Sequence, residues 1–370
     1  WCADASSSLQ NDLLCGEGDI KSTEPTKKLM AIARAARNSE AILKVLQTAS
    51  PEALATIVHS EPEFSWFAGE VEDYLRQYGF RCMNELKLEE YSLRDRPEFV
   101  YQILKNYALM NNSELLDSAA MEARERGIRQ EAEKKAFSSI AKHHHWFPRA
   151  AVFRWVLRNA RVGVKNRENM RFARTKIYGV VRELLGSMGR QLAEEGLIDS
   201  REDIFYLTID EVWDFVKGTA VSADLRGLAA SRKAEFAEYR ENEEAYPDEH
   251  FETYGMAYHR NIFRRATKEN AVSGDGDLRG IPCCPGVVSA PVKVIQSPSD
   301  DISLNGEILV AGRTDPGWVP LYPSVSGILI ERGSILSHSA IVAREMGIPT
   351  IVGISGLLER LNTGDRVTMD

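Results

Sequence analysis

A single histidine, His338, lies between two serines where a loop rich in glycine and serine turns into a short apolar helix. Gly347 and Pro349 provide the end signals for that helix. A helix N-terminus presents unpaired N–H groups and a partial positive charge, which keep an imidazole neutral and attract a phosphoryl group. We therefore predict that His338 is a nucleophile that carries phosphate. Ser337 and Ser339 would donate their hydroxyls to the phosphate oxygens.

A lone histidine near a helix start is more often a capping or surface residue, so the surrounding string decides the interpretation. That string, GSILSHSAIVAREMGIPTIVG from Gly333 to Gly353, resembles the swivelling phosphohistidine domain of the phosphoenolpyruvate-utilising enzymes. The resemblance covers about residues 280–370, with Pro285-Gly286 and the turn Thr314-Asp315-Pro316-Gly317-Trp318. It implies that His338 is phosphorylated and that Thr314 supports the phosphate. Arg332 stands where the family usually has threonine, and it adds either a phosphate-binding cation or a solvated charge.

A second dense segment, Arg167 to Leu192, predicts an amphipathic helix with several cations. A row of guanidinium groups suits an anion, although a solvated basic face explains the same residues. This segment, and Tyr78 to Leu104, are similar to the substrate-binding domain of rifampin phosphotransferase and its relatives. Phe80 replaces a histidine usual in those relatives. The acceptor-binding residues that we predict are Arg171, Arg174, Lys176, Tyr178 and Arg81.

The chain of 370 residues is long enough for two or three domains. The composition of residues 1–24 predicts a poorly ordered lead-in. In residues 25–270 the apolar residues recur at helical spacing throughout. The Gly/Asp-rich residues 271–280 predict a hinge. Short β-branched runs follow in residues 281–370. The predicted fold is therefore multidomain, with an all-α substrate-binding domain followed by a small β/α swivelling phosphohistidine domain. Its predicted strands are Val292 to Ile295, Glu307 to Val310, Gly327 to Ile330, Thr350 to Val352 and Arg366 to Met369.

Composition excludes several classes of partner. The net charge of −8 argues against nucleic acid or an anionic membrane as the principal partner, and we expect neither. The five cysteines show no spaced framework, which predicts reduced thiols and a cytoplasmic protein. In Lys142 to Phe147, KHHHWF, three consecutive histidines cannot all face one ion from a helix. No metal site is predicted on this chain.

The sequence has no Gly-rich phosphate loop followed by Lys-Ser/Thr, so we expect a fragment that is inactive toward ATP alone. The resemblance implies that ATP and Mg²⁺ bind an N-terminal domain of the same polypeptide or a partner chain. That domain would phosphorylate His338, and the swivel would carry the phosphoryl group to a small-molecule acceptor, leaving AMP and phosphate, as in antibiotic modification. The alternatives are an ATP-dependent condensing ligase of natural-product biosynthesis and a non-catalytic phosphocarrier or binding module.

Overall fold

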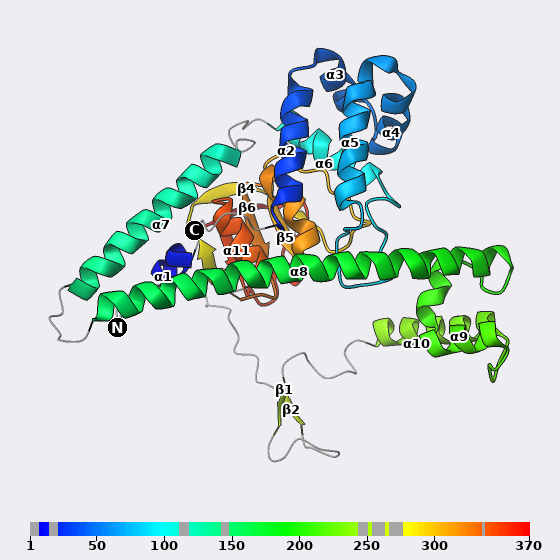
Figure 1. Cartoon of the computed structure of the whole chain (residues 1–370). Helices are drawn as coiled ribbons and strands as arrows, with labels where there is room; N and C mark the ends of the chain where they lie inside the picture. Colours follow the sequence, from blue (N-terminus) through cyan, green and yellow to red (C-terminus); the bar gives the residue numbers. More distant parts are fainter. Residues whose placement is uncertain are drawn as a thin grey trace. The chain divides into compact units, whose positions relative to one another are not determined.

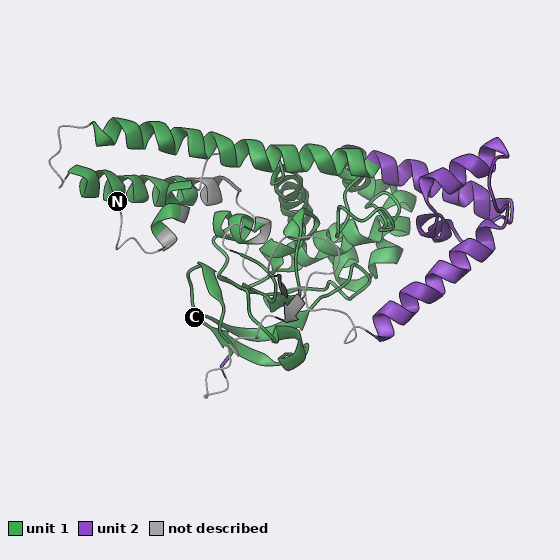
Figure 2. Ribbon diagram, turned by 90° about the horizontal axis from the view of Figure 1, so that it is seen from below, with its two compact units in different colours: residues 1–179, 278–370 green, residues 180–277 purple. Residues whose placement is uncertain are grey.

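The computed structural model describes residues 7–14, 21–110, 118–141, 148–242, 251–253, 263–265, 277–334 and 337–370. The chain divides into two compact units, shown in Figure 2. The first comprises residues 1–179 and 278–370, and the second comprises residues 180–277. The predicted hinge lies outside the described residues from 271 to 276, and so does the KHHHWF segment at 142–147.

The first unit begins with helices, coloured blue to green in Figure 1. They are α1 (Ser7–Leu14), α2 (Glu24–Arg37), α3 (Glu40–Thr48), α4 (Pro51–Ser60), the short 3-10 helix η1 (Pro62–Phe64), α5 (Ser65–Tyr78), α6 (Glu98–Leu109) and α7 (Ser118–Ala141). Their starts follow local chemistry, because Ser39 and Ser50 accept hydrogen bonds from Ile42 N and Ala53 N. Pro51 stands in the first turn of α4, where its missing N–H breaks no helical hydrogen bond.

Helix α8 (Arg149–Glu194) is 46 residues long, and the boundary between the two units falls within it. In the first unit it packs with α1 and α7 around a small apolar cluster that includes Leu13, Ala136 and Leu157. Arg161 ties these helices together, since its Nε donates to Leu13 O at 2.8 Å and its Nη2 lies 2.7 Å from Glu133 Oε1. The predicted lead-in at residues 1–24 therefore contains a packed helix.

The carboxyl-terminal part of the first unit is a six-stranded sheet of order β3-β7-β6-β5-β4-β8. Its strands are β3 (Ile281–Cys284), β4 (Val288–Val294), β5 (Ile308–Ala311), β6 (Gly327–Ile330), β7 (Thr350–Val352) and β8 (Arg366–Met369). The four central strands pair in parallel, and β3 and β8 are antiparallel edges. Five strands match the prediction within a few residues, whereas β3 was not predicted. Pro282 lowers the strand signal of β3, and an edge position tolerates it.

Two crossovers on the parallel strands place the elements that matter for function. The 3-10 helix η5 (Pro316–Ser324) joins β5 to β6, and helix α11 (His338–Glu345) joins β6 to β7. A further short helix, α12 (Leu357–Arg360), follows β7. Alternate residues of β5 belong to different apolar clusters, since Leu309 lies in the large core and Ile308 in a smaller one. The sheet is therefore covered on both faces.

The large core runs without interruption from the helices into the sheet. Leu29 and Tyr107 of the helical part belong to the same buried cluster as Trp318 and Tyr322 of η5. All four side chains are at most 1% exposed. Helix α6 and η5 are in direct contact, and α11 packs against η5, β3 and β7. Residues 21–110 and 278–370 thus form one packed body in this state.

The second unit contains the end of α8, the 3-10 helix η3 (Arg201–Tyr206), α9 (Ile209–Lys217) and α10 (Leu225–Glu241). Leu192, Ile204 and Leu225 lie in its apolar core. Two short strands, β1 (Phe251–Thr253) and β2 (Phe263–Arg265), pair antiparallel. Helix up to residue 270 was predicted, and that prediction is wrong here. Strands of three residues, here Phe-Glu-Thr and Phe-Arg-Arg, are too short to leave a periodic signal.

Candidate functional site

His338 is the first residue of α11, as predicted. Ser337 precedes it in an extended conformation, and its hydroxyl accepts a hydrogen bond from Ala340 N at 3.4 Å. The helix stops at Gly347, which takes the left-handed φ of 68° that glycine adopts readily. The side chains of His338 and Ser339 lie outside the described part. The backbone places residue 338 at a helix N-terminus, a position that generally favours phosphate binding.

The loops after β5 and β6 lie side by side at the carboxyl edge of the parallel sheet. Glu331 N donates to Ala311 O at 3.1 Å, and Arg332 N donates to Gly312 O at 2.9 Å. Thr314 therefore lies in the loop beside the one that leads to His338, and its Oγ1 accepts from Tyr322 OH at 3.1 Å. Ligands of parallel α/β sheets gather at this edge. The structure brings the predicted residues Thr314, Arg332 and Ser337 to it.

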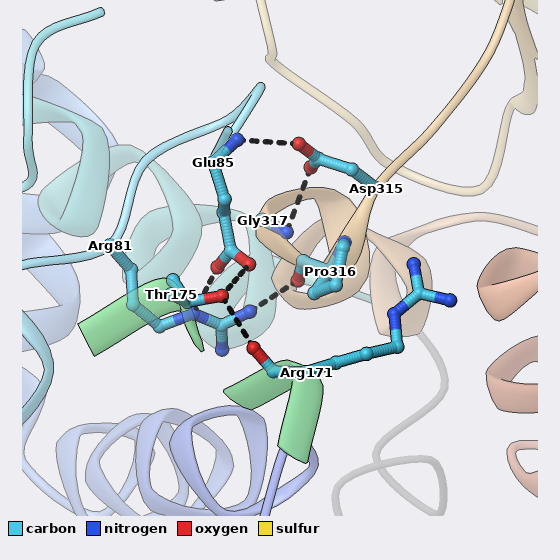
Figure 3. Close-up of polar contacts among 7 residues, drawn as sticks. All are labelled: Arg81, Glu85, Arg171, Thr175, Asp315, Pro316 and Gly317. Carbon is cyan, nitrogen blue, oxygen red and sulfur yellow. Dashed lines mark hydrogen bonds and ion pairs between the residues drawn. The ribbon is translucent and has the colours of Figure 1, made fainter. Parts of the chain in front are cut away.

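A buried polar cluster joins this edge to the helices, and we call its members Arg81, Glu85, Thr175 and Asp315 the carboxylate cluster (Figure 3). Arg81 Nε donates to Glu85 Oε1 at 2.6 Å, and Arg81 Nη2 donates to Pro316 O at 2.5 Å. Glu85 N donates to Asp315 Oδ2 at 2.6 Å, and Thr175 Oγ1 donates to Glu85 Oε2 at 2.8 Å. Three segments distant in sequence thus meet at Glu85.

Local backbone geometry presents Glu85 to its partners. Asn84 adopts a left-handed φ of 57°, which asparagine tolerates better than most residues, and its O accepts from Lys87 N at 2.8 Å. On the other side, Asp315 also accepts from Gly317 N at 2.9 Å and so caps η5. A Cβ added to Gly317 would lie 1.9 Å from Cys82 O. Only a glycine allows the turn and the loop to approach this closely.

Burial makes the electrostatics of the cluster unusual. The side chains of Arg81 and Glu85 are each 2% exposed. Burial and then the Glu85 carboxylate raise the pKa of Asp315 to about 7, against the opposing effects of its backbone hydrogen bonds and of Arg81. The carboxyl of Asp315 lies beside Glu85, and the attraction of Arg81 only partly offsets burial and this neighbouring carboxylate. Ionising Asp315 in this setting is therefore costly.

The predicted acceptor-binding cations occupy three different settings. Arg81 is buried in the carboxylate cluster. Arg174 is exposed on α8, and Lys176 Nζ lies over the rings of Phe172 and Phe80, at 5.4 and 5.9 Å from their centroids. Arg171 is half-buried, and its Nε has no hydrogen-bond partner among the described residues. Figure 3 shows its guanidinium extending away from Glu85 and past Pro316. Tyr178 is half-buried on the same helix.

Phe80, which stands where the related sequences usually have histidine, is part of this packing. Its ring meets Phe172 edge-on at 5.9 Å. A Cβ added to Gly179 would lie 2.7 Å from Phe80 Cβ, so α8 approaches the residue closely. Phe80 thus supplies an apolar wall beside Lys176.

The sequence analysis missed Glu85, Thr175 and Asp315 as a functional group. In the sequence, Glu85 stands near the charged residues Lys87 and Glu89, a pattern that is typical of an exposed surface. The available signal was Asp315 inside the Thr314 to Trp318 string. Among the described residues, no group of three or more His, Cys, Asp or Glu side chains is placed to hold a metal ion. No helix in the described ranges is long and apolar enough to cross a membrane.

Comparison with known proteins identifies both parts of the first unit. Residues 302–370 match the family described as PEP-utilising enzyme, mobile domain. Residues 3–168 match the rifampicin phosphotransferase fourth domain. The carboxylate cluster therefore joins residues of the two matched regions: Arg81 and Glu85 belong to the fourth domain, and Asp315 belongs to the mobile domain.

Several curated relatives align over most of the chain. Rifampicin phosphotransferase of Streptomyces sviceus is 28% identical over 80% of this chain and 33% of its own length. The uncharacterized phosphotransferase YvkC of Bacillus subtilis is 26% identical over 95% of this chain and 41% of its own length. The prodigiosin synthesizing transferase PigC of Serratia marcescens is 26% identical over 98% and 39%. The chain thus spans about a third to two fifths of these relatives.

These matches agree with the His338 string, the sheet topology and the helical part that precedes it. The chain is thus similar to the PEP-utilising enzymes in two of its regions, one matching their mobile domain and the other the rifampicin phosphotransferase fourth domain.

Proposed function

We propose that this chain is the acceptor-binding and phosphohistidine part of an ATP-dependent phosphotransferase, with His338 as the residue that is phosphorylated. The observation that carries the proposal is the place of His338, which begins α11 at the carboxyl edge of the parallel strands. The unpaired backbone N–H groups at a helix N-terminus carry a partial positive charge. This charge favours a neutral imidazole over an imidazolium and attracts the phosphoryl oxygens. ATP and Mg²⁺ are assigned to a separate nucleotide-binding domain, as the sequence predicts.

The proposed reaction has three balanced steps. An imidazole nitrogen of His338 attacks the β-phosphorus of ATP, and AMP leaves. Water then cleaves the bond to the γ-phosphorus and releases phosphate, which leaves one phosphoryl group on His338. A nucleophilic oxygen of the acceptor finally attacks phosphorus, loses its proton to solvent or a base, and the neutral imidazole departs. Cations stabilise the spread charge of the moving phosphoryl group.

We place the acceptor along α8 beside the sheet edge, near Arg171, Arg174, Lys176 and Tyr178. Arg171 is the strongest candidate for the cation of the transfer step, because its half-buried guanidinium extends past the η5 turn without a partner at Nε. Arg332 and Thr314 would support the phosphate from the sheet side, with Ser337 and Ser339. The rings of Phe80 and Phe172 suit an acceptor with a large apolar part.

The names of the relatives guide the choice of acceptor. Several are rifampicin phosphotransferases, so the acceptor that we propose is a hydroxyl group on a natural product. The match to the prodigiosin synthesizing transferase covers 98% of this chain and keeps a second candidate open. In that case the phosphoryl group would activate a carbonyl or carboxylate for condensation.

Labelling tests the proposal in the complete polypeptide that contains this chain. With ATP labelled at the β-phosphate, we expect an acid-labile, base-stable label on the wild type and none on His338→Ala. His59→Ala is the matched control, because His59 is exposed on α4, and it should keep the full label. A label that persists in His338→Ala would contradict the proposal.

Transfer is tested separately with rifampicin as the probe acceptor. Arg171→Gln should slow the loss of phosphohistidine to rifampicin by about tenfold or more, because one charge-assisted contact to phosphate contributes roughly 1.5–3 kcal/mol. Phosphorylation of His338 should be unchanged in this variant. Arg190→Gln, a partly solvated arginine farther along α8 that donates to Ser187 Oγ, is the control and should transfer at the wild-type rate.

A further inference from the structure

The helical part and the mobile domain are held together by directional bonds as well as by apolar packing. Three side chains of the helical part donate to backbone carbonyls of the carboxyl-terminal domain. Arg81 donates to Pro316 O at 2.5 Å, Asn106 donates to Ile302 O at 2.9 Å, and Tyr107 donates to Pro320 O. Bonds of this kind fix an orientation, since a small rotation of the domain would break all three.

The carboxylate cluster is the charged part of this contact. Its burial costs desolvation free energy, whereas burial of the apolar part is favourable. Arg81 and Glu85 are almost completely removed from water, and Asp315 is brought against Glu85. Buried ion pairs contribute little net affinity, because desolvation offsets the attraction, yet they penalise any geometry that leaves a charge unpaired. Separation of the two parts would return these groups to water. Such a contact specifies one pose and still permits release.

The cluster also connects the two sides of the proposed transfer site. Thr175, which donates to Glu85, lies one turn from Arg171 on α8, with its Oγ1 3.1 Å from Arg171 O. Asp315 adjoins Thr314, at the sheet edge that leads to His338. The helix turn that carries Arg171 and the edge that carries His338 are therefore held in register through Glu85.

We propose that Glu85 and Asp315, with Arg81 and Thr175, form a latch that docks the mobile domain on the helical part in the pose used for transfer to the acceptor. The members are positioning residues and touch neither phosphate nor acceptor. Their role in transfer rests on the proposed function. The docking itself does not, so the two ideas can fail separately.

Two variants release the latch by different means. Asp315→Ala removes both oxygens that accept from Glu85 N and Gly317 N. Gly317→Ala leaves every charge in place but adds a methyl group where only 1.9 Å separates it from Cys82 O. The controls make the same chemical changes elsewhere. Asp300→Ala removes a carboxylate that accepts from Gln296 N and Ser297 N, and Gly69→Ala adds a methyl group with nothing within 4 Å.

Hydrogen exchange in the complete polypeptide reads the docking directly. In both latch variants we expect exchange to rise about tenfold or more, together, in peptides covering residues 79–95 and 313–325, because each side protects the other. Exchange in β4 and β6 should stay unchanged, and the two controls should match the wild type. Charging of His338 by potassium phosphoramidate should stay within about twofold of the wild type, whereas transfer to rifampicin should fall about tenfold or more.

Unchanged protection of both peptides in Asp315→Ala and Gly317→Ala would overturn the latch. Global loss of protection in both variants, β4 and β6 included, would overturn it as well, because a releasable contact must leave each part folded. The proposed function fails on a different result. If the wild type is not charged at His338 while the exchange pattern is as expected, the docking contact stands and the phosphohistidine role falls.

Discussion

Two groups of carboxylates, one in each unit, have opposite electrostatic settings. In the second unit Glu211 and Asp203 each have their own cation: Arg232 donates to Glu211 through two bonds of 2.6 and 2.7 Å, and Lys233 Nζ lies 2.5 Å from Asp203 Oδ1. Hydrogen bonding to Arg232 lowers the pKa of Glu211 to about 2. Burial raises the pKa of Asp203, but the bonds to Lys233 and Ser200 outweigh it and the net shift is downward.

In the first unit, Glu85 accepts from Arg81, whereas Asp315 accepts from backbone N–H groups beside it, and its pKa moves upward to about 7. The difference separates two uses of the same chemistry. The pairs of the second unit join η3, α9 and α10, and the folded state stabilises their ionised carboxylates. The carboxylate cluster also joins two parts of the molecule, but there the folded state destabilises the ionised form of Asp315. A contact of that kind suits a domain that must dock and leave.

The largest expected effect comes from removing the cation in each region. Arg81→Met removes the cation beside two neighbouring carboxylates in a buried site, so the free energy of unfolding of the first unit should fall by about 3–5 kcal/mol. Arg232→Met breaks a partly exposed pair and should cost the second unit about 1 kcal/mol or less. Urea unfolding followed by hydrogen exchange in α6 and α10 measures the two. Equal losses would remove the distinction between the regions.

The pH dependence should differ in sign. The native pKa of Asp315 is about 7 against a usual value of 3.8, so the packed state holds its proton between these values and loses stability as pH rises from about 4 to about 7. Asp315→Asn lacks this loss. As pH rises across this window, the unfolding free energy of Asp315→Asn should therefore increase relative to that of the wild type, by at most about 1.4 kcal/mol per pH unit. Above pH 7 the difference between the two proteins should stay constant.

Glu211→Gln is the counterpart in the second unit. The native pKa of Glu211 lies near 2 against a usual value of 4.5, so its stabilisation is fully present above pH 4.5 and is lost as pH falls toward 2. Solvent screening keeps this effect below about 1 kcal/mol. For each carboxyl, the unfolding free energy of the variant is subtracted from that of the wild type at each pH. If this difference changes with pH in the same direction for Asp315 and Glu211, the folded first unit does not destabilise ionised Asp315.

The smallest effects come from the hydroxyl donors. Thr175→Val leaves a buried oxygen of Glu85 without its 2.8 Å donor and should cost about 1–2 kcal/mol. Ser200→Ala removes the 2.6 Å bond to Asp203, which keeps Lys233, and should cost less than about 1 kcal/mol. Thermal unfolding of both variants ranks them. A larger loss of stability in Ser200→Ala than in Thr175→Val would contradict the comparison, because the buried carboxylate that depends more on its hydroxyl donor would then lie in the second unit.

Local signals in the sequence were enough to predict α11, with its end at Gly347, and five of the six strands of the sheet. These elements follow from glycine, proline and β-branched residues close together in the chain. The bonds that join the carboxylate cluster to the η5 turn connect residues 230 or more apart, so no local pattern predicts them. Arg81 looked like a ligand for substrate because a cation in sequence carries no mark of its burial. Strands β1 and β2 were missed because three residues are too few for periodicity.

The most direct test of the central claim compares two histidines at opposite ends of helices. His338 begins α11, whereas His59 lies in the last turn of α4, 3.5 Å from Glu72. Potassium phosphoramidate should phosphorylate His338 about tenfold faster than His59, the ratio for roughly 1.4 kcal/mol between a positive and a negative helix end. Tandem mass spectrometry at alkaline pH assigns both sites in one sample. Phosphorylation of His59 at an equal or greater rate would contradict the account of His338 as a phosphate carrier.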